Sequence, residues 1–297
     1  MVAHPEPGGE GPIRVLREDL VLVDWGPMTL TVAAWQGGRP RPVMAANAAR
    51  AALASLAELA DFQGYLKRTA ERLPAGRPLP PVVERARRAA LIAPAELTPL
   101  AAVAGAVADQ VAEAALALGA DKVIVNNGGD IALRLTGRTQ ATVGIRPRAG
   151  PGEAPPPLMA RLRVRSGQGV GGVATSGWSG RSFSPGLADL VTVWAGEAAL
   201  ADAAATFIAG RVDVVSPAVT RAPADSLDPA SDLGPRLVVT HVGPLTPGER
   251  AAALAAGQAA ALALRQAGHI AGCLIALQGE LALLDPSRRL LPPVSAA

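Results

Sequence analysis

The sequence is poor in cysteine, aromatic residues and charged side chains. Its 297 residues include one cysteine, Cys273, which excludes an internal disulfide and a cysteine-rich metal site. Aromatic residues make up 3% of the chain and charged residues 18%, whereas hydrophobic residues, many of them alanine, make up 49%. This composition predicts closely packed small-residue helices rather than aromatic clusters, in a chain long enough to bury a sizeable core.

Histidine and lysine are also scarce, and neither indicates a site. The three histidines, His4, His241 and His269, share no motif spacing, so a histidine-based metal site or a Ser/His/Asp triad has little support. Lysine occurs only at Lys67 and Lys122, and the arginines are scattered along the chain. Because no run of basic residues forms a nucleic-acid footprint, we expect no nucleic-acid partner.

Targeting and membrane signals are missing as well. Residues 1–10 have neither a basic segment nor an apolar segment of the kind found in secretory signals. The most apolar helical windows, 101–118 and 251–264, are interrupted by polar or charged residues, so neither is a good membrane span. We therefore expect a cytoplasmic protein without a membrane partner. Residues 1–12 are rich in proline and glycine and are expected to be disordered.

Hydrophobic periodicity and turn residues predict a mixture of helices and strands. Helices are expected at 47–73, 82–91, 98–118, 196–209 and 246–267, the first capped by Asn47. Strands are expected at 15–25, 28–35, 122–126, 131–135, 140–146, 158–166, 190–194, 236–242, 270–277 and 280–284. These elements do not alternate strictly, so an α+β fold with mixed and antiparallel sheets and packed alanine-rich helices is favoured over a doubly wound sheet.

The domain organisation follows from the same pattern. We expect one α+β domain over 13–297, with a division into two lobes left open. The proline-rich segments 149–157 and 216–235 lack periodicity and are predicted to be surface loops.

A glycine-rich stretch, 171–177, is the first candidate site. It offers the hydroxyls of Thr175 and Ser176 and several unhindered amides, including that of Gly177, which suit the binding of phosphate oxygens. Arg181 lies close enough in sequence to add charge. No Lys-Ser or Lys-Thr follows the glycines, so this is not a P-loop. The alternative interpretation is a flexible surface loop.

A second candidate is the run Asn126-Asn127-Gly128-Gly129-Asp130 between two predicted strands. By itself it is typical of a hairpin turn, because paired glycines permit positive φ. The functional interpretation is that the same glycines let backbone N–H groups approach a planar or anionic ligand closely. The sequence leaves both interpretations open.

Asp202 and Thr206 form the third candidate. They share a helix face, since 3.6 residues per turn places residue i over i+4. Alanines surround them, so the carboxylate is expected to be buried and to need a cation or hydrogen-bond donors. Mg²⁺ accepts such a sparse set of oxygen ligands and fills its other positions with water and phosphates. Alternatively, Thr206 bonds back to the carbonyl of residue 202 while Asp202 meets an arginine.

Several stretches together resemble the ordered motifs of the ApbE family. They are Ala-Gly-Ala-Val-Ala-Asp-Gln-Val (104–111), Val-Asn-Asn-Gly-Gly-Asp-Ile (125–131), Val-Gly-Ile-Arg-Pro (143–147), Ala-Thr-Ser-Gly (174–177), Val-Thr-Val (191–193) and Ala-Asp-Ala-Ala-Ala-Thr (201–206). The resemblance covers about 90–210, and more loosely the turn at 26–28. Members of that family are Mg²⁺-dependent FAD:protein FMN transferases, and some are FAD pyrophosphatases.

The resemblance implies an ApbE-like fold with FAD or a related nucleotide in a cleft. The implied binding residues are Met28, Asn127, Gly128, Gly129, Asp130, Thr175, Ser176, Gly177 and Arg181. The implied Mg²⁺ ligands are Asp202, Thr206 and the carbonyl of Ala205. The implied partners are a flavin or nucleotide and an acceptor protein, and a homo-oligomer is left open.

Two departures from the family pattern qualify what it implies. A lysine typical of the family is missing, since the matching residues are Val103, Ala104 and Gly105. The segment 178–189 contains no histidine, so the family's catalytic His/Asp pair cannot be transferred to this chain. The segments 176–183 and 227–234 bring the chain closer to an ApbE-related family of cytoplasmic proteins. The sequence therefore supports two hypotheses: a Mg²⁺-dependent enzyme acting on FAD, or a flavin-binding or nucleotide-binding protein without catalysis.

Overall fold

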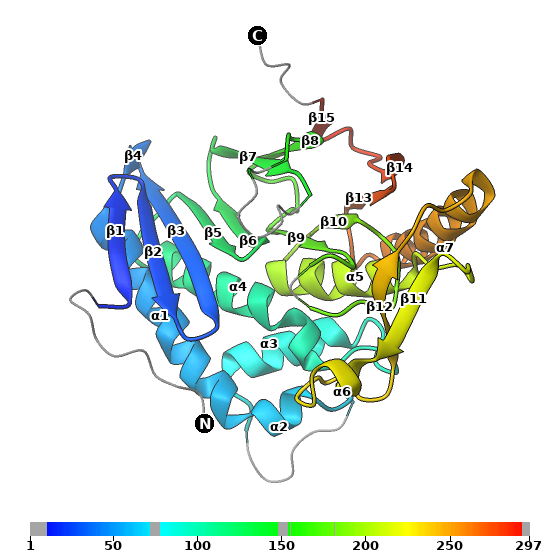
Figure 1. The fold of residues 1–297 in the computed structure, drawn as a ribbon. Helices are drawn as coiled ribbons and strands as arrows, with labels where there is room; N and C mark the ends of the chain where they lie inside the picture. Colours follow the sequence, from blue (N-terminus) through cyan, green and yellow to red (C-terminus); the bar gives the residue numbers. More distant parts are fainter. Residues whose placement is uncertain (1–10, 72–77, 148–153, 155, 181, 293–297) are drawn as a thin grey trace.

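A ten-stranded antiparallel sheet with helices packed on one face organises the molecule (Figure 1). The computed structural model describes residues 11–71, 78–147, 154, 156–180 and 182–292. Along the sheet the strands run β1-β2-β3-β5-β6-β9-β10-β13-β14, with β4 paired to β3. Every strand pairing in the described ranges is antiparallel. The predicted α+β class with antiparallel sheets is confirmed.

The strands of the main sheet are β1 (Ile13–Arg17), β2 (Leu20–Trp25), β3 (Met28–Gln36), β4 (Arg39–Pro40), β5 (Lys122–Asn127), β6 (Asp130–Leu135), β9 (Gly172–Ser176), β10 (Leu190–Ala195), β13 (Gly272–Leu277) and β14 (Glu280–Leu284). Two smaller sheets contain β7 (Gln140–Ile145), β8 (Ala160–Arg165) and β15 (Leu290–Leu291), and β11 (Val219–Pro223) with β12 (Leu237–Val242). The helices are α1 (Pro42–Asp61), α2 (Gln63–Leu66), α3 (Pro81–Ala90), η1 (Pro99–Ala102), α4 (Val103–Ala117), α5 (Ala198–Arg211), α6 (Ala224–Leu227) and α7 (Pro247–Gln266).

Strand β10 shows why the molecule has layers on both sides of the main sheet. Its six residues are all buried. Val191 and Val193 pack into the core that contains α5 and α7. Leu190 and Trp194 point to the opposite face, because side chains alternate along a strand, and pack into the core beneath β7 and β8. The helices and the β7–β8 sheet therefore cover opposite faces of the same strand.

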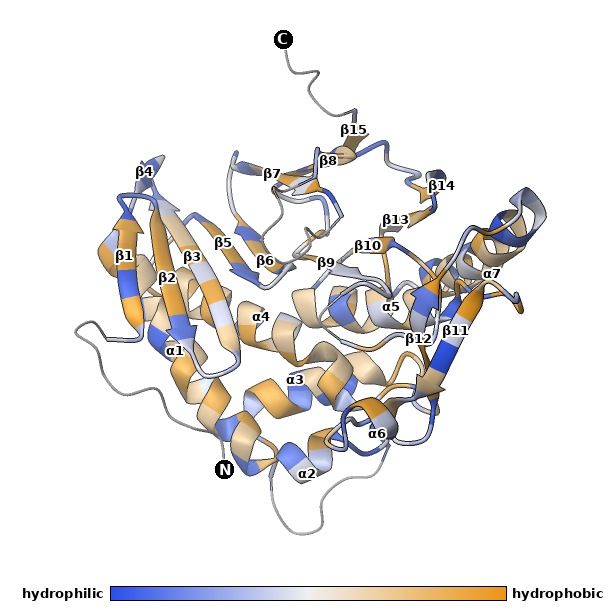
Figure 2. Cartoon of the chain, viewed as in Figure 1, coloured by the Kyte–Doolittle hydropathy of each residue, from blue (hydrophilic) through white to orange (hydrophobic). Residues whose placement is uncertain are grey.

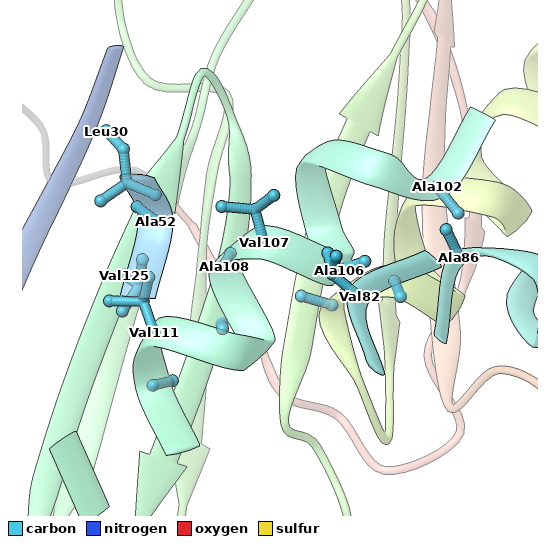
Figure 3. Close-up of a cluster of buried hydrophobic side chains, with 14 of the residues drawn as sticks. Leu30, Ala52, Val82, Ala86, Ala102, Ala106, Val107, Ala108, Val111 and Val125 are labelled. Atoms are coloured by element: carbon cyan, nitrogen blue, oxygen red, sulfur yellow. The ribbon is translucent and has the colours of Figure 1, made fainter. Parts of the chain in front are cut away.

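Small side chains let the helices pack closely, as the composition predicts. In Figure 2 the helices beneath the sheet, α4 among them, carry mostly hydrophobic residues. Figure 3 shows Val107 and Val111 of α4 close to Val125 of β5 and to Ala52 of α1. Residues 99–117 are long and apolar enough to cross a membrane by length and composition alone, but half of that window is buried inside the fold. One such helix, packed in this way, is weak evidence for a membrane span.

Most predicted elements occur where expected, with four corrections. The single strand predicted at 15–25 is two strands, β1 and β2, which pair antiparallel across a turn at Glu18 and Asp19. The helix predicted from Asn47 begins instead at Pro42, because proline at the first helical position presets φ, and it ends at Asp61. The predicted loop 216–235 contains β11 and α6, because β11 pairs with β12, a partner distant in sequence. The predicted loop 171–177 contains β9, as described below. Residues 1–10 and most of 149–157 lie outside the described residues.

Candidate functional site

One cavity of about 730 Å³ collects most of the residues that the sequence analysis singled out. It lies within the 300–1,000 Å³ range of small-molecule sites. Its walls come from the start of β3, part of α1, the start of α4, the β5–β6 turn, the end of β7, β9 with the segment after it, the start of β10, and one face of α5. The cavity therefore joins segments that are far apart in sequence.

The β5–β6 turn forms one wall. Asn127 pairs with Asp130, and the two residues between them, Gly128 and Gly129, have φ angles of 69° and 117°. Such positive φ values are the reason for glycine at both positions. The Asn127 side chain donates a hydrogen bond to the carbonyl of Ala104, 3.1 Å away, which ties the turn to the start of α4. The hairpin interpretation is correct for the backbone, and the same turn lines the cavity.

The glycine-rich stretch 171–177 is mostly a strand, which corrects the prediction of a loop with free amides. Strand β9 pairs with β10 on one side and with β6 on the other. The hydrogen bonds of the sheet therefore use backbone N–H groups that a loop would leave available to a phosphate. Gly172 is required for packing, since a Cβ there would overlap the backbone of Ala198 at the start of α5. What faces the cavity is the end of the strand, with Thr175, Ser176 and Gly177.

Thr175 is positioned by its neighbour on β10. Its hydroxyl lies 2.9 Å from the hydroxyl of Thr192, and the two residues are paired across the strands. Thr192 is buried, whereas Thr175 is exposed at the cavity wall. The pair places two hydroxyl groups side by side where β9 and β10 line the cavity.

Asp202 reaches the cavity from α5 and makes an unexpected contact. One carboxylate oxygen, Oδ2, accepts a hydrogen bond from the backbone N–H of Gly105 at 3.0 Å. Gly105 lies in the first turn of α4, where backbone N–H groups have no partner within the helix. The partner is therefore an amide and not the arginine of the alternative interpretation. Thr206, one turn further along α5, lines the same cavity.

The charge of Asp202 is unfavourable in this setting. Burial is the main cause that raises the pKa of Asp202 well above its usual range, and the nearby carboxylates of Asp130 and Asp109 raise it further. The hydrogen bond from Gly105 acts in the opposite direction. Two carboxylates, Asp202 from α5 and Asp130 from the start of β6, thus line the same cavity.

Asp109 caps α5 from the neighbouring helix α4. It is 0% exposed, and its two oxygens accept hydrogen bonds from the N–H groups of Ala198 at 3.1 Å and Ala199 at 2.9 Å. Arg134 on β6 balances its charge through a 2.9 Å ion pair. The sequence analysis missed this role, and the available signal was an acidic residue inside an apolar helical window.

The segment between β9 and β10 offers no histidine and little free acid. Asp189 lines the cavity, but both of its carboxylate oxygens accept hydrogen bonds. Oδ1 accepts one from the Trp178 indole N–H at 3.3 Å, and Oδ2 accepts one from the backbone N–H of Gln278 at 2.5 Å. No histidine is among the described residues that line the cavity. Both oxygens of Asp189 are therefore already engaged in holding the loop.

Most of the predicted binding residues line the cavity. Eight of the nine predicted binding residues line the cavity: Met28, Asn127, Gly128, Gly129, Asp130, Thr175, Ser176 and Gly177. The ninth, Arg181, lies outside the described residues. Ala205, whose backbone carbonyl is the predicted metal ligand, is absent from the residues that line the cavity, and its side chain packs in the core shared with α7. The sequence analysis did not select Arg146, at the end of β7, which also lines the cavity.

Metal-ligating side chains are sparse. Within the described ranges, no three His, Cys, Asp or Glu side chains form a group that could hold a metal ion. The cavity instead offers the carboxylates of Asp202 and Asp130 and the hydroxyl of Thr206. Hard oxygen donors of this kind suit Mg²⁺, which completes its shell with water and phosphate.

Comparisons with known sequences give one match that covers most of the chain. A protein-family model described as AbpE bacteria matches residues 14–283. A UPF0280 protein of Methanopyrus kandleri is 45% identical over 111 residues, which are 37% of this chain and 41% of that protein. A UPF0280 protein of Methanothrix thermoacetophila is 41% identical over 115 residues, 38% of this chain and 46% of that protein. The chain thus matches less than half of the length of these relatives.

Two solved structures are similar to parts of this chain at low identity. The apo form of the flavinyl transferase ApbE of Pseudomonas stutzeri has a TM-score of 0.33 and 18% identity, over 61% of this chain and 79% of that one. The ApbE protein of Thermotoga maritima has a TM-score of 0.36 and 15% identity, over 81% of this chain and 74% of that one. The likeness is partial, and no functional assignment rests on it.

Proposed function

The chain belongs to the ApbE-related family described as AbpE bacteria, and from this premise we propose that it binds FAD or a related nucleotide together with Mg²⁺ in the cavity beside α5. One observation carries the proposal. The carboxylates of Asp202 and Asp130 line the same cavity as the Gly128–Gly129 turn, so oxygen donors suited to a cation and a turn without side chains lie in one cavity.

The residues present fit a divalent cation. Asp202 uses one oxygen for the Gly105 amide, and the pKa of its carboxyl is raised by burial and by Asp130. A divalent cation would offset the repulsion between the two carboxylates, which otherwise disfavours ionising both. Asp202 and Thr206 would hold the cation, with Asp130 adding negative charge nearby. The cation would neutralise the pyrophosphate of the nucleotide and orient it.

The chain's own groups supply the rest of the binding site. The hydroxyls of Thr175 and Ser176 can donate hydrogen bonds to phosphate oxygens, and the Arg146 guanidinium can add positive charge. The Gly128–Gly129 turn has no side chains to obstruct a ligand that approaches its backbone. Met28, which is 6% exposed, contributes an apolar part of the wall.

Whether FMN transfer or pyrophosphate cleavage follows binding depends on a general base. Asp189 is engaged by Trp178 and Gln278, and no histidine lines the described part of the cavity. The second candidate is therefore a binding protein without turnover. Incubation with FAD and Mg²⁺, followed by chromatography for AMP and FMN, separates the two candidates.

The binding experiment uses Asp202→Asn, which preserves an acceptor for the Gly105 amide and removes the charge. Flavin fluorescence titrations with and without Mg²⁺ should show Mg²⁺-dependent FAD binding by the natural chain and loss of the Mg²⁺ dependence in this variant. Asp225→Asn, at an exposed position on α6 outside the cavity lining, is the matched control. Equal Mg²⁺ dependence in both variants would exclude Asp202 as a ligand, and no flavin or nucleotide binding at all would overturn the proposal.

A further inference from the structure

Phe183 is an aromatic side chain left open to the cavity. The chain has three phenylalanines. Phe62 is 5% exposed in the core and Phe207 packs against buried side chains, whereas Phe183 is 38% exposed. No other aromatic residue is among the described residues that line the cavity. Phe183 therefore combines an exposed side chain with a place in the cavity lining.

The backbone beside Phe183 is firmly held. Ser184 is buried, its carbonyl accepts a hydrogen bond from Val239 of β12 at 2.9 Å, and its hydroxyl accepts one from the Gly186 amide at 3.2 Å. The Leu187 amide donates to the carbonyl of Val212 at 2.7 Å, just after α5. Gly186 is packed so closely against Ala209 that a Cβ would overlap its carbonyl oxygen. Phe183 is therefore presented by an anchored backbone.

The other cavity walls indicate what the ring meets. Carboxylates and hydroxyls suited to a metal–pyrophosphate group line the β5–β6 turn and α5, and aliphatic side chains such as Val143 and Ile145 line the β7 side. A nucleotide joins a planar heteroaromatic ring to its phosphates through a short linker, so one ligand can fill both kinds of wall. Exposed aromatic side chains bind such rings by offset stacking.

We propose that Phe183 stacks on the planar heteroaromatic ring of the nucleotide bound in the cavity. This inference rests on the proposed function and goes beyond it by assigning the residue that recognises the ring. A fixed aromatic platform adds affinity because little side-chain freedom is lost on binding. The same geometry accepts an isoalloxazine or an adenine ring, since both present a π face.

The test compares ligands with and without a ring. Dissociation constants of FAD, FMN, AMP and inorganic pyrophosphate are measured with Mg²⁺ for the natural chain and for Phe183→Ala, Phe183→Leu and Phe183→Tyr. Phe183→Ala should weaken binding of the ring-bearing ligand about tenfold, the loss expected for one stacked base. The dissociation constant of Phe183→Leu should lie between those of the natural chain and Phe183→Ala. Phe183→Tyr should bind the ligand with the same affinity as the natural chain. Pyrophosphate affinity should be unchanged in all three.

Comparing FMN with AMP shows whether the isoalloxazine or the adenine ring stacks on Phe183. Weaker FMN binding with unchanged AMP binding identifies the isoalloxazine, and the reverse identifies the adenine. The control is Leu281→Ala, which alters a 55% exposed apolar residue on β14 outside the cavity lining. This variant should change neither the FMN affinity nor the AMP affinity. If the natural chain binds FAD but Phe183→Ala binds it within twofold, the stacking inference is overturned and the proposed function stands. If the natural chain binds no nucleotide, the proposed function itself fails.

Discussion

Asp109 and Asp202 cap each other's helices. Asp109 of α4 accepts hydrogen bonds from the first amides of α5, and Asp202 of α5 accepts one from Gly105 in the first turn of α4. Neither helix has a side-chain cap of its own. Each carboxylate also lies near the positive end of the partner helix dipole. This reciprocal arrangement fixes the helix that carries Asp202 and Thr206 relative to the β5–β6 turn.

Removal of Asp109 should destabilise the fold strongly. Asp109→Ala leaves the N–H groups of Ala198 and Ala199 without their acceptor and removes one of the two carboxylates that pair with Arg134, the other being Glu113. Each buried donor left without an acceptor costs about 1–3 kcal/mol. Urea unfolding followed by circular dichroism measures the change. Asp225→Ala is the surface control, and a loss below 1 kcal/mol for Asp109→Ala would contradict the capping role.

Gly105→Ala should push α4 and α5 apart. A Cβ at this position would overlap the carbonyl of Ala198, and overpacking of this kind costs about 1–3 kcal/mol. Gly248→Ala, in the first turn of α7 with no atom near the added Cβ, is the matched control and should be neutral or slightly stabilising. The free energy of unfolding of the two variants is compared with that of the natural chain. Equal values for the two variants would show that the helices do not cross as closely as described.

Cys273 should be unreactive while the chain is folded. Burial raises the pKa of its thiol to about 12, so almost none is thiolate at pH 8. Absorbance of Ellman's reagent at pH 8 should report no thiol in the native protein and one thiol in guanidinium chloride. Rapid native labelling would show that β13 is more open than in the structure.

The raised pKa of the Cys273 thiol also makes the stability of the fold depend on pH above about 9. The folded pKa is above the value of 9.0 for a free thiol, so the folded state retains the proton over a range in which the unfolded state loses it. The contribution of Cys273 to stability is full below about pH 9 and falls towards pH 12, by at most about 1.4 kcal/mol per pH unit. Subtracting the alkaline unfolding profile of Cys273→Ala isolates this dependence. A difference profile that stays flat above pH 9 would exclude it.

Mg²⁺ and nucleotide should stabilise the folded chain if the proposed site is real. A ligand at one hundred times its dissociation constant adds about 2.7 kcal/mol to the free energy of unfolding. Thermal unfolding with FAD and Mg²⁺ should therefore show a raised midpoint that EDTA lowers again. Asp202→Asn should lose the EDTA-sensitive part. A midpoint that EDTA lowers equally in both proteins would locate the cation elsewhere.

Elements with local signals were predictable from the sequence. Helix α7 begins at Pro247, one residue after the start of the predicted helix 246–267, and Thr246 and Glu249 form its capping box. Gln278-Gly279 forms the two-residue turn between β13 and β14. Such signals act within four or five residues, so a linear pattern contains them. Strands β9 and β11 escaped prediction because their pairing partners, and not their local composition, make them strands.

The sequence by itself determined that Asp202 and Thr206 share a helix face and that Gly128–Gly129 makes a turn, because helical periodicity and the steric freedom of glycine are local properties. Tertiary structure alone decided what these residues face. Gly105 and Asp202 are 97 positions apart, and the hydrogen bond between them exists only because α4 and α5 pack with small residues at their crossing. The cavity likewise depends on the meeting of segments that are far apart in sequence, and no periodicity within any one of them encodes that meeting.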